Sequence, residues 1–110
     1  SNCNRGGLSA VTRLLTDPAL SASCKKEREA ARALLGARVA AFNRAAHGVL
    51  RYPRYEGGFF VTVFSEGAHE KANRMKDAGV FVVPQKGAWR VGLCSVAERD
   101  VKRLVEAFAI

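Results

Sequence analysis

The feature that most constrains this fold is a stretch of about thirty residues, from Asp17 to His47, with a helical pattern and no strong breaker except Gly36. Asp17 can cap a helix, Pro18 suits the first helical turn, and Gly48 suits the end. Apolar residues follow one face: Leu20, Leu34, Leu35, Val39, Phe42 and Ala46. This length is well above the usual 11–12 or so residues, so we expect the helix to brace a small domain against something larger.

Shorter elements lie on both sides of this helix. Leu8 to Leu15 have helical spacing and predict a short first helix. The later patterns predict three strands, over Phe59–Phe64, Val80–Val83 and Trp89–Cys94. Between the first two strands they predict a helix that is capped by Ser65, runs to about Ala78 and is closed by Gly79. After the third strand they predict a last helix to Phe108, with Ser95 and Glu98 as its capping box.

This order of elements predicts an α+β fold, with a long N-terminal helix followed by a small mixed sheet that has helices packed on one face. The first two strands are joined through a helix and so can form a parallel crossover, whereas the last two are close enough for a hairpin. We expect residues 1–110 to form a single domain, because the length suits one core. Residues 1–48 are its helical part, and residues 49–110 its strand-helix-strand-strand-helix part.

Composition excludes several classes of protein. The longest apolar run, Gly57–Phe64, is far shorter than the ~20 residues that span a bilayer, and no signal peptide opens the chain, so we expect no membrane partner. Cys3, Cys24 and Cys94 are widely spaced and form no CxxC pair. This spacing argues against a metal site, and the odd count favours reduced thiols in the cytoplasm.

A net charge of +8 leaves a rival class open. Basic chains bind nucleic acid or other anions, so a basic α+β nucleic-acid-binding module is one alternative. A small-molecule regulatory module is another. The positive charges, however, are spread along the chain and mixed with acids, and the strands lack the aromatic pattern of an RNA-recognition sheet. We therefore expect no nucleic acid partner.

Several short motifs occur in a characteristic order along the chain. Together they are Ser1-Asn2, Thr16-Asp17-Pro18-Ala19-Leu20, Gly57-Gly58-Phe59-Phe60, Arg90-Val91-Gly92-Leu93-Cys94 and the closing helix from Glu98 to Phe108. In order and spacing they resemble the C-terminal small domain of class I pyridoxal-phosphate-dependent aminotransferases, the aspartate and aromatic amino acid type. The resemblance covers essentially the whole chain, with departures at Trp89 and Gly92.

The resemblance implies a function in transfer of an amino group between an amino acid and a 2-oxo acid. The Schiff-base lysine and the other groups that hold pyridoxal 5'-phosphate would belong to a large domain upstream of Ser1, in a parent enzyme that is a cytoplasmic homodimer. Ser1 is not an initiator Met, which fits processing, an added terminus or a cut within a longer protein. The chain would then be inactive alone, with no catalytic, cofactor-binding or metal residue of its own.

Two residues are candidates for substrate binding. Arg90 interrupts an apolar strand, and a guanidinium there needs an anionic partner if it is buried. The residues alone leave open a water-facing arginine on an edge strand or a pair with Glu56 or Asp77. The resemblance implies that Arg90 grips the substrate carboxylate as a bidentate clamp. It also implies that Phe60 borders the substrate pocket, although packing in the core is the simpler explanation for Phe60.

Overall fold

We describe residues 3–109 of the chain from a computed structural model. The chain divides into two compact units, one ending at Ala33 and the other beginning at Leu34. Within residues 3–109, no helix combines the length and the apolar character needed to cross a bilayer. Ser1-Asn2, the first motif of the resemblance, lies outside the described residues.

The first unit contains helix α1 (Arg5–Thr16) and the first part of helix α2 (Pro18–Ala46). Asp17 caps α2 as predicted, whereas α1 begins at Arg5, three residues before the expected start at Leu8, with Asn4 as its N-cap. Asn4 Oδ1 accepts a hydrogen bond from Gly7 N at 3.0 Å, and Asp17 Oδ1 accepts one from Ala19 N at 3.0 Å. No residue of α1 is buried, so its apolar side chains contribute nothing to the core of the described chain.

The second unit contains the core. The C-terminal part of α2 contributes Val39, Phe42 and Ala46 to this core, and Gly48 follows the helix with a φ of 74°. Only glycine adopts that backbone conformation without strain, so Gly48 ends the long helix as predicted.

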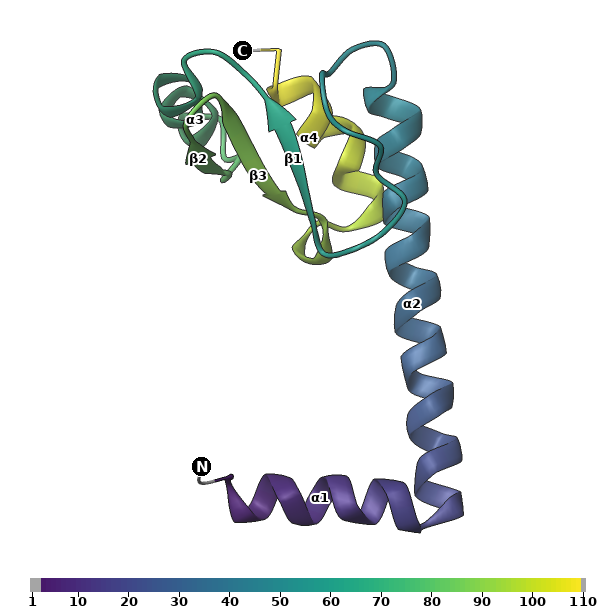
Figure 1. Cartoon of the computed structure of the whole chain (residues 1–110). Coiled ribbons are helices and arrows are strands. Elements are labelled where there is room, and N and C mark those ends of the chain that lie inside the picture. Colours follow the sequence, from purple (N-terminus) through teal and green to yellow (C-terminus); the bar gives the residue numbers. More distant parts are fainter. Residues whose placement is uncertain (1–2, 110) are drawn as a thin grey trace. The chain divides into compact units, whose positions relative to one another are not determined.

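The sheet has three strands, β1 (Phe60–Phe64), β2 (Val83–Gln85) and β3 (Ala88–Gly92), in the order β1-β3-β2 (Figure 1). Both pairs of neighbours are antiparallel, so the prediction of a mixed sheet is wrong, although the α+β class is confirmed. The reason is the tight turn at Lys86-Gly87, where Gly87 has a φ of 74°. This turn folds β3 back between β2 and β1, so the two parallel strands never pair.

Two strand boundaries also differ from expectation. The second strand begins at Val83, where Val80–Val83 was expected, because Val80 N instead bonds to Met75 O at 2.9 Å and completes the end of a helix. The third strand ends at Gly92, and Leu93–Ser95 form a 3₁₀ turn, η1. Both differences arise from hydrogen bonds that local apolar patterns do not reveal.

The remaining helices are α3 (Ala68–Asp77), a 3₁₀ turn η2 (Glu98–Asp100) and α4 (Val101–Ala107). Neither predicted serine cap forms. Gly67 occupies the N-cap of α3 without a side-chain bond, and Ser95 Oγ donates to Gly92 O at 3.0 Å. Gly79 closes α3 with a φ of 80°, as predicted.

The sheet has one covered face. Val61, Val63, Trp89 and Val91 point inward and pack with α2, α3 and α4 in one core, which confirms the predicted helices on one face. Trp89 links the layers, because its Nε1 donates to Ala68 O at 2.8 Å and its ring stacks on Phe108 at 5.2 Å. The opposite face of the sheet therefore carries the alternate strand residues.

Candidate functional site

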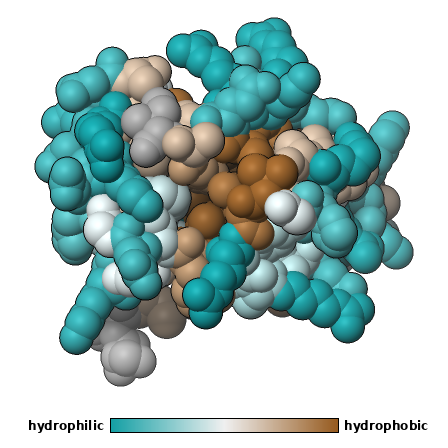
Figure 2. All heavy atoms as spheres, turned by 90° about the horizontal axis from the view of Figure 1, so that it is seen from above, coloured by the Kyte–Doolittle hydropathy of each residue, from teal (hydrophilic) through white to brown (hydrophobic). Residues whose placement is uncertain are grey.

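We define the outer sheet face as the strand residues that point away from this core. Cross-strand pairing places them in three rows: Phe60 with Gly92, Thr62 with Arg90 and Val83, and Phe64 with Ala88 and Gln85. Large apolar groups on this face are open to solvent, with Phe60 54%, Phe64 45% and Val83 49% exposed. A different view, from above the orientation of Figure 1, shows a further group of hydrophobic residues at the molecular surface, bordered by hydrophilic ones (Figure 2).

Arg90 lies in the middle of the outer sheet face. It belongs to the central strand β3, and the alternation of that strand buries Trp89 and Val91 while exposing Arg90. It faces water, as one alternative held, but from the central strand rather than an edge strand. It forms no ion pair with any residue in the described range, and Glu56 pairs with Arg54 instead. The guanidinium therefore presents a charge with no carboxylate partner from residues 3–109.

Phe60 and Arg90 are in direct contact. The Arg90 Cζ lies 4.9 Å from the centroid of the Phe60 ring, a cation–π arrangement. On the opposite strand, a Cβ added at Gly92 would lie 3.5 Å from the Phe60 ring, an ordinary van der Waals contact. Gly92 therefore lies directly beside the ring. The structure brings both predicted site residues together, and Phe60 is exposed rather than part of the core.

A second stack of the same kind lies at the other end of β1. The Arg51 Cζ lies 5.6 Å from the centroid of the Phe64 ring. Phe64 N also donates to Arg51 O at 2.8 Å, so the backbone of the loop is fixed beside the strand. Sequence analysis missed this pair. The alternation of β1 places Phe60 and Phe64 on one face, so it could have indicated that both rings lie there. No local pattern indicated that Arg51 lies beside Phe64.

The entry to β1 is fixed by two tyrosines. Tyr52 Oη donates to Asn43 Oδ1 at 2.9 Å, Asn43 Nδ2 donates to Tyr55 O at 2.8 Å, and Tyr55 Oη donates to Gly58 O at 2.6 Å. Both rings pack edge-on against Phe42. Burial raises the pKa of both phenols, and for Tyr55 the charge of Cys94 adds a smaller effect in the same direction. This network joins α2 to the strand that carries Phe60.

The exit from β3 is fixed by Arg38 of α2. Its Nη1 donates to Cys94 O at 2.6 Å, and its Nε is buried without a partner among the described residues. Arg38 was not among the residues that the sequence singled out. The contact joins residues far apart in the sequence, so periodicity could not reveal it. Arg38 holds the η1 turn immediately after the strand that carries Arg90.

The described residues do not fit a covalent pyridoxal-phosphate site. A lysine that forms a Schiff base is typically desolvated or placed beside another cation. Here Lys71 is half-buried with its Nζ 3.4 Å from Ser65 Oγ, and the others are exposed: Lys25, Lys26, Lys76, Lys86 and Lys102. Across residues 3–109, no group of three or more His, Cys, Asp or Glu side chains is placed to hold a metal ion.

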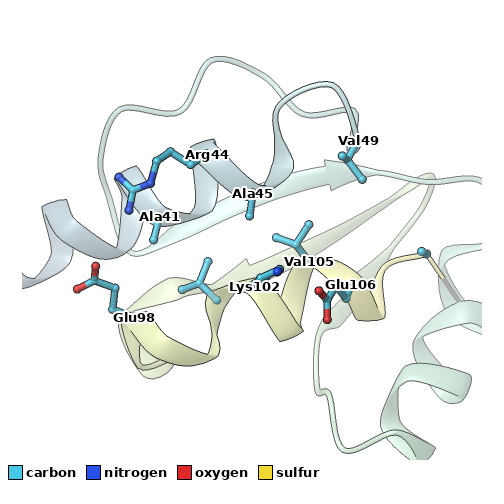
Figure 3. Close-up of a pocket in the computed structure, with 10 residues that line it drawn as sticks. Ala41, Arg44, Ala45, Val49, Glu98, Lys102, Val105 and Glu106 are labelled. Atoms are coloured by element: carbon cyan, nitrogen blue, oxygen red, sulfur yellow. The ribbon is translucent and has the colours of Figure 1, made fainter.

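A separate groove lies between the end of α2 and α4, with a volume of about 580 Å³ (Figure 3). Its floor is apolar and its rim carries both signs of charge; its lining includes Ala41, Arg44, Ala45, Val49, Glu98, Val101, Lys102, Val105 and Glu106. Neither Arg90 nor Phe60 lines it. The groove offers apolar contact but no arrangement of groups for catalysis.

Comparison with known proteins finds a similar fold among solved structures. No protein-family model and no curated protein matches the sequence. Among solved structures, an aminotransferase from Anaerococcus prevotii DSM 20548 matches with a TM-score of 0.81 and 26% identity over 86% of this chain. The match covers 24% of the length of that aminotransferase chain. The chain thus has the fold of one part of an aminotransferase, which confirms the fold implied by the sequence motifs.

Proposed function

We propose that residues 1–110 are the C-terminal small domain of a class I pyridoxal-phosphate-dependent aminotransferase and bind the α-carboxylate of its substrate. The observation that carries this proposal is Arg90, a cation without an ion-pair partner among residues 3–109, exposed on the central strand and stacked on Phe60. The likeness to a part of an aminotransferase supports it. The parent enzyme would transfer an amino group between an amino acid and a 2-oxo acid.

Arg90 performs the binding step in this proposal. A guanidinium stays charged and presents its N–H groups in a planar fork that matches a carboxylate. The Phe60 ring covers one flat side of this fork, and the N–H groups along its edges donate no hydrogen bond to any residue in the described range. A carboxylate that approaches the edge would be held in one plane and orientation. Phe60 would then border the bound substrate.

The cofactor would be held elsewhere in the parent protein. When bound, pyridoxal phosphate stabilises the carbanion that transamination requires. The exposure of most lysines here supports the proposal that this chemistry lies outside this chain. Closure of this domain over the substrate would exclude water from the reacting centre. We further propose a cytoplasmic homodimer as the state of the parent enzyme.

The decisive experiment is expression of the complete protein that contains this chain. We expect it to bind pyridoxal phosphate, with an absorbance band that borohydride reduction fixes to a lysine outside residues 1–110. The isolated chain mixed with the cofactor should show no such specific band. A stable adduct on the isolated chain, at one lysine and unaffected by substitution of the exposed lysines, would contradict the proposal that the cofactor-binding lysine lies outside this chain.

One observation favours a second candidate, a nucleic-acid-binding sheet. Phe60 and Phe64 are exposed with arginines beside them, as on a base-stacking platform, and the net charge is +8. Against this, each ring already has a guanidinium over it. Salt-sensitive binding of single-stranded RNA that both Phe60→Ala and Phe64→Ala weaken would favour this candidate. Binding that persists in the double variant would reflect net charge alone.

A further inference from the structure

Arg38 differs from every other arginine between residues 3 and 109, because it alone is partly buried. It lies in the C-terminal half of α2. Its Nη1 donates to Cys94 O at 2.6 Å and to Leu93 O at 3.5 Å, and both carbonyls belong to the η1 turn. A hydrogen bond from a charged donor is shorter and stronger than one between neutral groups. Arg38 therefore joins α2 to the segment that directly follows β3.

The end of β3 beyond Arg90 is held less firmly than its start. Arg90 is the last residue of β3 that pairs with β2, and Val91 and Gly92 pair with β1 alone. Within β2, Pro84 has no backbone N–H to donate to the sheet. Gly92 has no side chain to pack, and a glycine inside a strand weakens it. The position of the strand after Arg90 therefore depends on what holds the η1 turn.

The η1 turn has one apolar and one directed contact with the rest of the domain. Leu93 is fully buried in the core, but apolar packing has no preferred direction. The hydrogen bonds from Ser95 Oγ to Gly92 O and from Val96 N to Leu93 O close the turn on itself. Arg38 supplies the directed contact, because a hydrogen bond weakens steeply when its angle changes.

This contact should contribute less to stability than to position. The Nε of Arg38 is buried without a partner among residues 3–109, and such a donor has lost the hydrogen bonds that water would make. Cys94 is exposed, so water can reach its carbonyl when the guanidinium is removed. Water would satisfy that carbonyl but would not fix it to α2. Loss of Arg38 should therefore displace the end of β3 while the domain stays folded.

We propose that Arg38 is a positioning residue for Arg90. It fixes the exit of β3, and so it keeps the Arg90 guanidinium in the orientation that it has over the Phe60 ring. This inference rests on the proposed function, because it concerns the residue proposed to bind the substrate carboxylate. A bidentate pair demands a defined geometry, so a displaced strand weakens the grip. Arg38 does not contact the substrate and acts only through the strand.

The test is steady-state kinetics of the complete protein that contains this chain. L-Phenylalanine and L-aspartate are each tried as the amino-group donor, and the faster donor is kept for all variants. Arg38→Met should raise the KM of that donor about fivefold or more while kcat changes less than about twofold, because a weaker grip removes binding that the ground state and the transition state share. Arg38→Lys keeps a charged donor and should give an intermediate KM. Arg44→Met, which removes an exposed arginine of the same helix, should leave both constants unchanged.

A double-mutant cycle separates a positioning role from a merely structural one. Arg90→Lys replaces the planar fork by a point charge on a flexible stem, which does not depend on the exact direction of the strand. In that background Arg38→Met should raise KM by less than about twofold, because the two residues act on one contact. If Arg38→Met does not yield folded protein, Arg38→Lys is held to the same criterion.

The outcomes distinguish this inference from the proposed function. A KM that Arg90→Lys raises but Arg38→Met leaves unchanged would overturn the positioning role alone. An equal rise from Arg38→Met in both backgrounds would do the same, since the effect would not pass through Arg90. An unchanged KM in Arg90→Lys, or turnover of neither donor by the unaltered protein, would contradict the proposed function and with it the positioning role.

Discussion

The guanidinium of Arg90 lies over the Phe60 ring, with its Cζ 4.9 Å from the ring centroid, although the two residues belong to different strands. Arg90 pairs across the strands with Thr62, so its side chain reaches diagonally to Phe60. Diagonal neighbours on one face of a sheet are within reach of long side chains. This contact makes the cation and the aromatic ring one structural unit.

Arg90→Lys in the complete enzyme should raise the KM for the amino acid by about 10- to 100-fold. A lysine retains the positive charge but loses the bidentate fork, and a hydrogen bond to a charged group contributes about 1.5–3 kcal/mol. Steady-state kinetics measure the change, with Arg51→Lys as the control that should leave KM as it is. An unchanged KM for Arg90→Lys would contradict the assignment.

Trp89→Phe should lower the free energy of unfolding by about 1–3 kcal/mol, because Ala68 O would lose the donor that reaches it at 2.8 Å within a buried layer. Urea denaturation followed by circular dichroism measures the change. Phe60→Leu is the matched control, since it alters an exposed ring on the other face of the sheet and should change stability by less than about 0.5 kcal/mol. Equal effects of the two substitutions would contradict the assignment of inner and outer faces.

The two tyrosines should titrate above pH 10. Burial raises the pKa of Tyr52 and Tyr55 above the ordinary value of 10.0, because it disfavours the charged phenolate. Both side chains therefore stay neutral to higher pH in the folded chain than in the unfolded chain. The folded pKa values exceed the unfolded ones, so the associated stability is fully present below pH 10 and is lost as the pH rises through the folded values. The near-ultraviolet absorbance of tyrosinate measures both groups, because the chain has two tyrosines. Normal midpoints in the folded chain would contradict the prediction.

Two glycine substitutions should have opposite effects on stability. Gly36 lies within α2, and a Cβ added there meets nothing within 4 Å, so Gly36→Ala should stabilise the helix by about 0.5–1 kcal/mol. Gly79 has a φ of 80°, so Gly79→Ala should destabilise the chain by about 1 kcal/mol through backbone strain. Thermal unfolding of both variants gives the comparison. A loss of stability in Gly36→Ala would show that α2 is strained at this point.

Local signals explain why much of the helical structure was predictable. Asp17 and Pro18 start α2, and Gly48 follows its end, at the positions that capping rules indicate. The first strand was also predicted to within one residue at its start. These features depend only on residues that are close in the sequence, so local sequence patterns are enough to predict them.

The sequence by itself therefore determined the long helix with both of its ends, the α+β class, and the choice of Arg90 and Phe60 as residues of interest. Tertiary structure alone decided that β3 lies between β1 and β2, that Arg90 faces outward from the central strand, and that its guanidinium covers Phe60. Helix signals act over one or two turns, whereas strand order and register depend on pairing between distant segments. The partner of a strand, and hence the neighbours of Arg90, is defined only when the chain has folded.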